Sequence, residues 1–119
     1  MRKILTLMAA LLPAPALAAE LWCMPDTMCN PEGKCHATTD EESSIRLHNL
    51  ATKKTTMRSN AETIPMKRQK AGSAVEWRGT NERGGREYVI WSKTTNAYTY
   101  TVSDTDGAVW KATGVCEVQ

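Results

Sequence analysis

The sequence contains no phenylalanine, and aromatic residues make up only 6% of its 119 positions. Four tryptophans and three tyrosines must therefore supply the aromatic volume of the hydrophobic core. Beyond residue 18 there is no apolar run of the ~20 residues that a transmembrane helix needs. Internal repeats, low-complexity tracts and linkers are also absent. We expect a single β domain over residues 19–119, without a transmembrane segment.

The first 18 residues have the three-part pattern of a secretory signal peptide. Arg2 and Lys3 supply positive charge, and residues 4–12 form a short apolar stretch. The segment 16–18 then places small residues at the positions that a signal peptidase reads. The apolar stretch is too short for a membrane anchor. We expect cleavage after Ala18 and a periplasmic or secreted product.

No excess charge of one sign remains once this leader is removed. Loss of Arg2 and Lys3 lowers the 15 basic residues to 13, which equals the number of acidic residues. This balance gives no reason to expect nucleic-acid binding. The distribution is uneven, because residues 26–42 are mainly acidic and residues 46–70 mainly basic. A basic run is typical of a solvated face, and an anion-binding face is the alternative.

The chain has only four cysteines, and their spacing excludes most cysteine chemistry. Cys23, Cys29 and Cys35 follow one another at six-residue intervals, and Cys116 lies far along the chain. Zinc sites usually pair ligands about two to four residues apart, and haem attachment uses C-x-x-C-H. Thioredoxin-like chemistry uses C-x-x-C. Since none of these patterns is present, four cysteines in a small exported chain indicate two disulfides.

Local turn chemistry ranks the three connectivities that four cysteines allow. Between Cys29 and Cys35 the segment 30–33 reads Asn-Pro-Glu-Gly, which suits a type I turn. This turn would bring its flanking cysteines within bridging distance, and the segment between Cys23 and Cys29 has a weaker turn signal. We therefore predict Cys29–Cys35. The remaining bridge, Cys23–Cys116, would join the first strand to the last.

Residue alternation predicts an all-β fold. Strict alternation over 98–102 and the β-branched and aromatic run 87–91 give the clearest strand signals. Weaker signals lie at 45–50, 54–58 and 63–69, the last weakened by its proline. Seven or eight short strands with tight turns predict an antiparallel meander closed as a small barrel, with a β-sandwich as the alternative. A disulfide between the first and last strands favours the barrel.

Several of these features together resemble a known class of protein. A leader, the pair Trp22-Cys23, a small cysteine loop, a β-meander and the terminal segment 114–117 (Gly-Val-Cys-Glu) are similar to small exported proteins of Gram-negative bacteria. The architecture also resembles that of periplasmic inhibitors of c-type lysozyme, which are small disulfide-linked β-barrels. The resemblance spans residues 19–119 and implies fold and location. The loop motifs of those inhibitors have no counterpart at 85–91 or 98–103, so no functional residue is carried over.

Residues that commonly carry catalysis are sparse. His36 and His48 are the two histidines, and neither has a serine or free cysteine at a catalytic spacing. We expect no enzyme activity, no cofactor and no metal site. The sequence favours a binding or inhibitor-like module whose partner is a protein or an anionic envelope component. The alternative is an envelope-associated structural protein that contacts anionic lipid or glycan through basic strands 46–70.

Two groups of basic residues are candidates for contact with such a partner. The loop 79–86 carries Arg83 and Arg86 among three glycines, which allow close approach to a ligand. Arginine can bind carboxylates or phosphates through two parallel hydrogen bonds. Lys53 and Lys54 are expected at a hairpin tip, and Arg58 on the strand that follows. Because residues two apart share a strand face, an anion site requires the tip and one strand face to converge.

Overall fold

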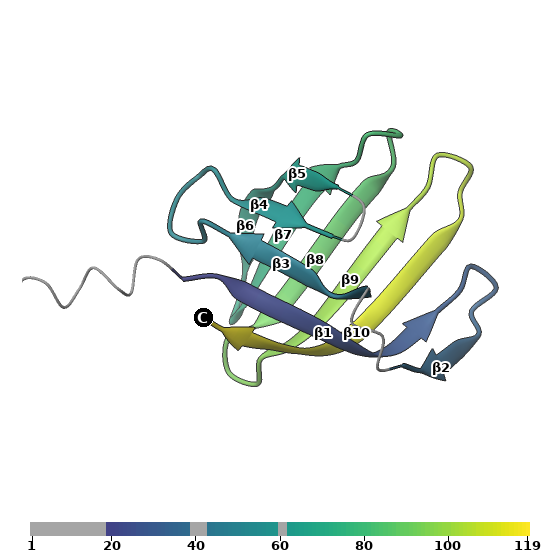
Figure 1. Cartoon of the computed structure of the whole chain (residues 1–119), viewed down its shortest axis with the longest axis horizontal. Helices are drawn as coiled ribbons and strands as arrows, with labels where there is room; N and C mark the ends of the chain where they lie inside the picture. The colour runs from purple at the N-terminus through teal and green to yellow at the C-terminus, as the bar shows by residue number, and fades with distance from the viewer. Residues whose placement is uncertain (1–18, 39–42, 60–61) are drawn as a thin grey trace, which may run out of the picture.

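The computed structural model describes residues 19–38, 43–59 and 62–119, and the predicted signal peptide lies outside these ranges (Figure 1). The described residues form ten antiparallel strands and no α-helix. The sheet order is β5-β4-β3-β1-β10-β9-β8-β7-β6, with β2 added against β1. The strands are β1 (Leu21–Cys29), β2 (Cys35–Ala37), β3 (Ile45–His48), β4 (Thr56–Arg58), β5 (Thr63–Pro65), β6 (Lys67–Ala71), β7 (Ala74–Thr80), β8 (Arg86–Ser92), β9 (Ala97–Ser103) and β10 (Val109–Val118).

The sheet is nearly closed into a barrel by a bend between β5 and β6. These two strands are the ends of the sheet order, and Met66 alone separates them in the chain. The Met66 amide donates a hydrogen bond to the Thr55 carbonyl at 2.9 Å, which ties the bend to the start of β4. The contacts of β5 with β7 complete the enclosure. The predicted all-β fold with barrel-like closure is therefore confirmed.

The structure differs from the sequence prediction in three strand assignments. The predicted strand 63–69 is divided at Met66, because Pro65 ends β5 and the chain then turns to pair with β7. The residue pattern also predicts strands over 108–112 and 115–118, and these form one strand, β10, which pairs with β1 from Lys111 to Val118. The short strand β2 was not predicted. It forms where the turn after Cys29 folds the chain back against β1.

The core consists of the inward-facing residues of the barrel strands. Its buried members are mainly aliphatic residues, methionines and the Cys23–Cys116 pair, packed around Trp77 and Tyr98. Trp91 and Tyr100 are partly buried against this cluster. The expectation that every tryptophan fills the core is wrong, because Trp22 and Trp110 remain 37% and 45% exposed. Trp22 alternates with two inward-facing residues of β1 and so lies on the outer face.

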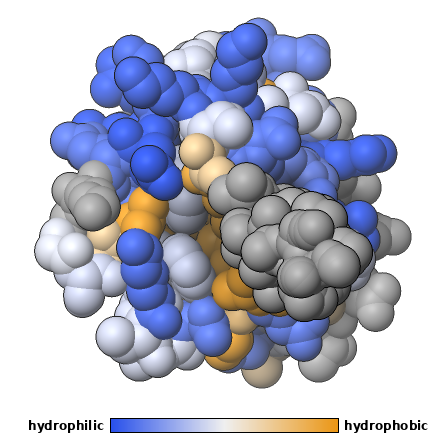
Figure 2. Space-filling view, turned by 90° about the vertical axis from the view of Figure 1, so that its left-hand side faces the viewer, coloured by the Kyte–Doolittle hydropathy of each residue, from blue (hydrophilic) through white to orange (hydrophobic). Residues whose placement is uncertain are grey.

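The outer surface is mainly hydrophilic, as strand alternation requires. Figure 2 views the end of the barrel that carries the β3–β4 loop. Hydrophilic side chains gather over the upper part of this view, and hydrophobic ones are visible in the hollows between them.

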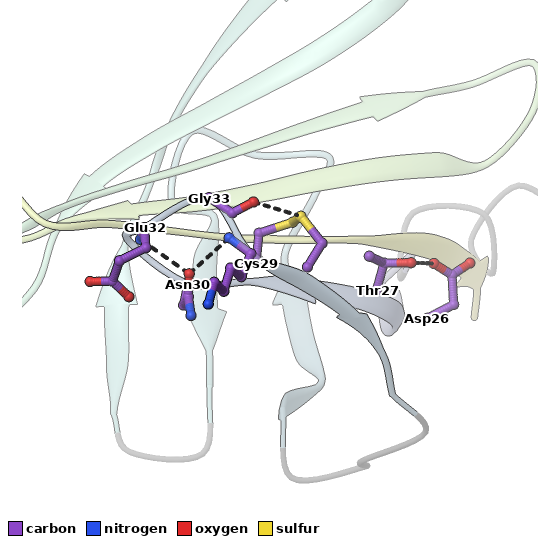
Figure 3. The surroundings of a disulfide bond; sticks show 8 residues. Asp26, Thr27, Cys29, Asn30, Glu32 and Gly33 are labelled. Atoms are coloured by element: carbon purple, nitrogen blue, oxygen red, sulfur yellow. Dashed lines mark hydrogen bonds between the residues drawn. A yellow bond between two sulfur atoms is a disulfide. The ribbon is translucent and has the colours of Figure 1, made fainter.

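Both predicted disulfides are present, and each joins residues that face each other across antiparallel strands. Cys23 pairs with Cys116 between β1 and β10, and Cys29 pairs with Cys35 between β1 and β2. The predicted turn forms between the latter two, because the Asn30 side-chain oxygen accepts hydrogen bonds from two amides that follow it (Figure 3). No described cysteine is free. Two disulfides are consistent with an oxidising extracellular or periplasmic compartment.

Candidate functional site: a basic groove

Three neighbouring strands place basic residues on one outer face. Lys67 of β6 faces Arg78 of β7, which in turn faces Tyr88 of β8. Two residues further along β7, Thr80 faces Arg86. The residues between them, such as Trp77 and Val89, are buried and therefore point inward. The alternation of the strands thus brings Lys67, Arg78 and Arg86 together on the outside of the sheet.

The β5–β6 bend brings a second basic segment to this face. Gly79 makes the bend feasible, because a Cβ atom there would lie 2.5 Å from the Met66 sulfur and 2.7 Å from the Pro65 carbonyl oxygen. Only glycine leaves room for the chain to cross β7 so closely. The bend is hydrogen-bonded to Thr55, and the residues just before Thr55 are Lys53 and Lys54.

These elements enclose an open groove with a volume of about 920 Å³. Among the described residues, its lining includes five cationic residues and no acidic one. All five are exposed: Lys53, Lys54, Lys67, Arg78 and Arg86. Buried Met66 and half-buried Tyr88 add apolar surface, and Thr55, Thr56, Thr80 and Gln69 add neutral polar groups. The groove therefore offers concentrated positive charge beside surface that could hold the uncharged part of a ligand.

One of the five cations is held in place by its neighbours. Arg78 Nη2 donates to Glu76 Oε1 at 3.0 Å, and the Arg78 guanidinium lies 5.6 Å from the centre of the Tyr88 ring. The other four have no ion pair among the described residues. Lys67 and Arg78 are like charges at directly opposed positions, an arrangement that destabilises an antiparallel pair. The groove thus has an excess of positive charge that an anion would neutralise.

The residues predicted as binding candidates are divided among three places. Lys53, Lys54 and Arg86 line the groove. Arg58 lies on the outside of β4, opposite Arg46 of β3. Arg83 is exposed in the turn between β7 and β8, where its amide donates to the Asn81 side chain at 3.1 Å. Neither Arg58 nor Arg83 lines the groove.

The sequence interpretation missed Arg78 and did not select Lys67 from the basic segment. Both residues could have been found from the register of two hairpins, β6–β7 and β7–β8. Pairing 74–80 with 86–92 places Arg78 opposite Tyr88, and the tight turn at Gly72 places Lys67 opposite Arg78. Fixing the positions of the turns would thus have identified these two cations together.

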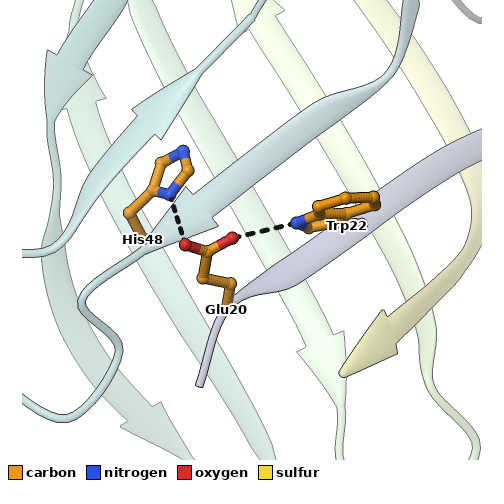
Figure 4. A network of polar contacts seen from close by, with 3 residues as sticks. All are labelled: Glu20, Trp22 and His48. Atoms are coloured by element: carbon orange, nitrogen blue, oxygen red, sulfur yellow. Dashed lines mark hydrogen bonds and ion pairs between the residues drawn. The ribbon is translucent and has the colours of Figure 1, made fainter. Parts of the chain in front are cut away.

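A second polar cluster lies on the outside of β1 and β3 (Figure 4). Glu20 accepts a hydrogen bond from Trp22 Nε1 at 3.0 Å, and its other oxygen lies 3.1 Å from His48 Nδ1. The Arg46 guanidinium lies 4.1 Å from the centre of the Trp22 ring. The hydrogen bond from Trp22, followed by that from His48, lowers the pKa of Glu20 below its usual 4.5. These contacts fasten the start of β1 to β3.

A third polar cluster is buried inside the barrel. The Glu87 carboxylate accepts hydrogen bonds from Asn81 Nδ2 at 2.9 Å and from the Tyr100 hydroxyl. Burial, then this hydrogen bond and the Glu87 charge, raise the pKa of Tyr100 well above its usual range. Burial also raises the pKa of Tyr98, whose hydroxyl has no hydrogen-bond partner among the described residues. The contacts of Glu87 hold the β7–β8 turn against β9.

Within the described ranges, no three histidine, cysteine or acidic side chains lie close enough together to hold a metal ion. No helix in the same ranges has the length and apolar character needed to cross a membrane. His36 lies in β2 and His48 in β3, on different strands.

Comparisons with known proteins identify no relative. No family model, no curated protein and no solved structure matches the chain. The basic groove therefore has to be interpreted from its own chemistry.

Proposed function

We propose that this protein is an exported, non-enzymatic binding module whose basic groove holds an anionic ligand. The observation that carries the proposal is the convergence of five cations, from the β3–β4 loop and three strands, on one groove that has no acidic residue in the described part of its lining. A concave site with convergent charge focuses the electrostatic field more strongly than a flat solvated face does. Its volume lies within the range of small-molecule sites, about 300–1,000 Å³.

Binding fits the lining residues better than catalysis does. The described residues that line the groove include no carboxylate, histidine or thiol, which are the groups that most often act as general acid, general base or nucleophile. Its cations and hydroxyls can donate hydrogen bonds to an anion without transferring a proton to it. The two disulfides support a periplasmic or secreted location for this activity.

The outer face of β1, β3 and β4 supports a second candidate function. It carries Arg46 and Arg58 at opposed positions, beside exposed Trp22 and Met24. Cations next to an exposed aromatic ring suit the surface of an anionic envelope component. Under this alternative, contact is made through the flat face by the part of the basic segment 46–70 that carries Arg46 and Arg58, and the groove is only solvated surface.

Two matched double variants distinguish the candidates. Lys67→Gln/Arg78→Gln removes two charges from the groove, and Arg46→Gln/Arg58→Gln removes the same number from the flat face. We expect only the groove variant to elute from phosphocellulose at clearly lower salt and to bind phosphate-bearing ligands at least ~10-fold more weakly. Charge-assisted hydrogen bonds contribute about 1.5–3 kcal/mol each, which accounts for such a loss.

The same pair of variants can overturn the proposal. Equal losses in both would mean that retention depends on net charge alone and that the groove is not a site. A loss confined to Arg46→Gln/Arg58→Gln would favour the envelope-surface alternative. Circular dichroism and thermal melting of each variant would verify that the fold is retained.

A further inference from the structure

The directly opposed pair Lys67 and Arg78 indicates which anion the groove selects. Opposed residues of antiparallel strands have Cβ atoms about 4.5–5.5 Å apart, so two full positive charges lie within one ligand's reach. Arg86 stands diagonally from Arg78, at about 7–8 Å on the same face. Glu76 pairs with Arg78 and offsets part of its charge. Lys67 and the three cations at the periphery have no ion pair among the described residues. A dianion with several oxygens could therefore neutralise more of this unpaired charge than a monoanion could.

Arg78 is positioned in advance for such a ligand. Glu76 accepts from one of its terminal nitrogens, and the Tyr88 ring lies beside the guanidinium. A guanidinium has five N–H donors, so several remain for a ligand while these contacts fix its direction. Lys67, across the strand pair, contributes three further donors in a flexible ammonium group. Together they match an anion with three acceptor oxygens.

We propose that the groove recognises a phosphomonoester, bound between Lys67 and Arg78, with its organic part lying toward Tyr88 and Met66. This inference rests on the proposed anion-binding function. A phosphomonoester carries a charge of about −1.5 to −2 at neutral pH and three strong acceptor oxygens. Sulfate esters and phosphodiesters carry a single negative charge. The remaining cations, Lys53, Lys54 and Arg86, surround this centre and add charge at its periphery.

The pH dependence of binding distinguishes this ligand class from other anions. The titratable and charged groups around the centre are Lys53 and Lys54 of the β3–β4 loop, Lys67 of β6, Glu76 and Arg78 of β7, and Arg86 and Tyr88 of β8. None of these is a histidine. The second ionisation of a phosphomonoester has a pKa of about 6, so its charge falls toward −1 below that pH. A sulfate ester keeps its charge over the same range.

The experiment is a calorimetric titration of the whole exported chain with phenyl phosphate and phenyl sulfate, above and below about pH 6. We expect phenyl phosphate to bind at least ~10-fold more tightly than phenyl sulfate at neutral pH. That preference should shrink as the pH falls below about 6. Lys67→Gln/Arg78→Gln should abolish the preference, and Arg46→Gln/Arg58→Gln should retain it.

Vesicle binding distinguishes a lipid-borne from a soluble phosphomonoester. Phosphatidylcholine vesicles with phosphatidic acid present a monoester, and those with phosphatidylglycerol present a diester. Preferential binding to phosphatidic acid would identify a lipid headgroup as an accessible source, and binding of phenyl phosphate alone would identify a soluble one. Either result supports the inference.

Two further outcomes distinguish a failure of the phosphomonoester inference from a failure of the proposed anion-binding function. Equal binding of phosphate and sulfate, with equal binding to the two kinds of vesicle, would overturn the phosphomonoester and leave anion binding in place. If neither soluble probe and neither vesicle binds, the proposed function fails as well.

Discussion

Gly79 and Met66 lie so close together that the fold has no space for a side chain at position 79. A Cβ atom there would also lie 2.7 Å from the Pro65 carbonyl oxygen, which is backbone and cannot turn aside. This contact connects the fold to the site, because the bend at Met66 closes the barrel and forms one wall of the groove.

We expect Gly79→Ala to destabilise the protein by about 1–3 kcal/mol, the usual range for overpacking. It should also weaken anion binding, because the displaced bend lines the groove. Denaturant unfolding and phosphocellulose retention measure the two effects. The neighbouring exposed Thr80→Ala is the control for stability alone, since Thr80 also lines the groove. An equal loss of stability there would show that the close approach at Gly79 is not limiting.

The two disulfides should differ in their contribution to stability. The Cys23–Cys116 bridge closes a separation of 93 residues and the Cys29–Cys35 bridge one of 6. Loop-closure entropy gives roughly 4.7 and 2.2 kcal/mol, respectively. We therefore expect Cys23→Ala/Cys116→Ala to lower the unfolding free energy more than Cys29→Ala/Cys35→Ala does. Equal changes in melting midpoint would mean that packing, not loop length, determines both contributions.

The sequence predicted those features of the fold that depend on local chemistry. Alternation identified the strand around Tyr100, and a run of β-branched and aromatic residues identified the strand around Val89. The turn after Cys29 identified both disulfide pairings. The bend at Met66 could not be predicted in this way, because it depends on the approach of Gly79, which is distant in sequence. The exposure of Trp22 was missed because composition alone does not say which face of β1 is buried.

The basic groove shows the same limit. Lys53, Lys54 and Arg86 were chosen for local reasons, as a hairpin tip and a glycine-rich loop, and all three line the groove. Lys67 and Arg78 are 11 residues apart in the sequence and become opposed only through the register of β6 and β7. Sequence proximity therefore identified the periphery of the groove, and its centre required the pairing of strands.

Removing charge from the centre of the groove should stabilise the unliganded protein. Lys67 repels the opposed Arg78, and like charges at such positions destabilise a sheet by roughly 0.2–1 kcal/mol. We expect Lys67→Gln to raise the unfolding free energy by that amount while weakening phosphate binding. Lys111 of β10 faces the uncharged Thr101, so Lys111→Gln is the matched control and should change neither. A loss of stability in Lys67→Gln would contradict the repulsion.

The contacts of Glu20 should make stability depend on pH in the acidic range. Its pKa is lowered in the folded protein by Trp22 and then by His48, so the ionised form is favoured by folding. This contribution is present above the usual pKa of 4.5 and is lost as the pH falls through the lower folded value. We expect Glu20→Gln to reduce the melting midpoint at neutral pH and to match the wild type in strong acid.

The buried tyrosines provide a matched pair for testing the interior of the barrel. The Tyr100 hydroxyl donates to the buried Glu87 carboxylate, whereas the Tyr98 hydroxyl has no partner among the described residues. Tyr100→Phe would leave a carboxylate oxygen without its donor and should destabilise by about 1–3 kcal/mol in denaturant unfolding. Tyr98→Phe removes an unpaired hydroxyl and should be neutral or slightly stabilising.

Unfolding at alkaline pH tests the burial of Tyr98 and Tyr100 independently. Burial raises the pKa of both tyrosines, so the folded state keeps their protons where the unfolded state begins to lose them, near the usual pKa of 10.0. Their contribution to stability is therefore complete below that pH and is lost as the pH rises above it. Each Phe variant should lose less stability than the wild type over this range. If Tyr98→Phe destabilises as much as Tyr100→Phe at neutral pH, the Tyr98 hydroxyl has a partner in solution, and a buried water is the group that would supply it.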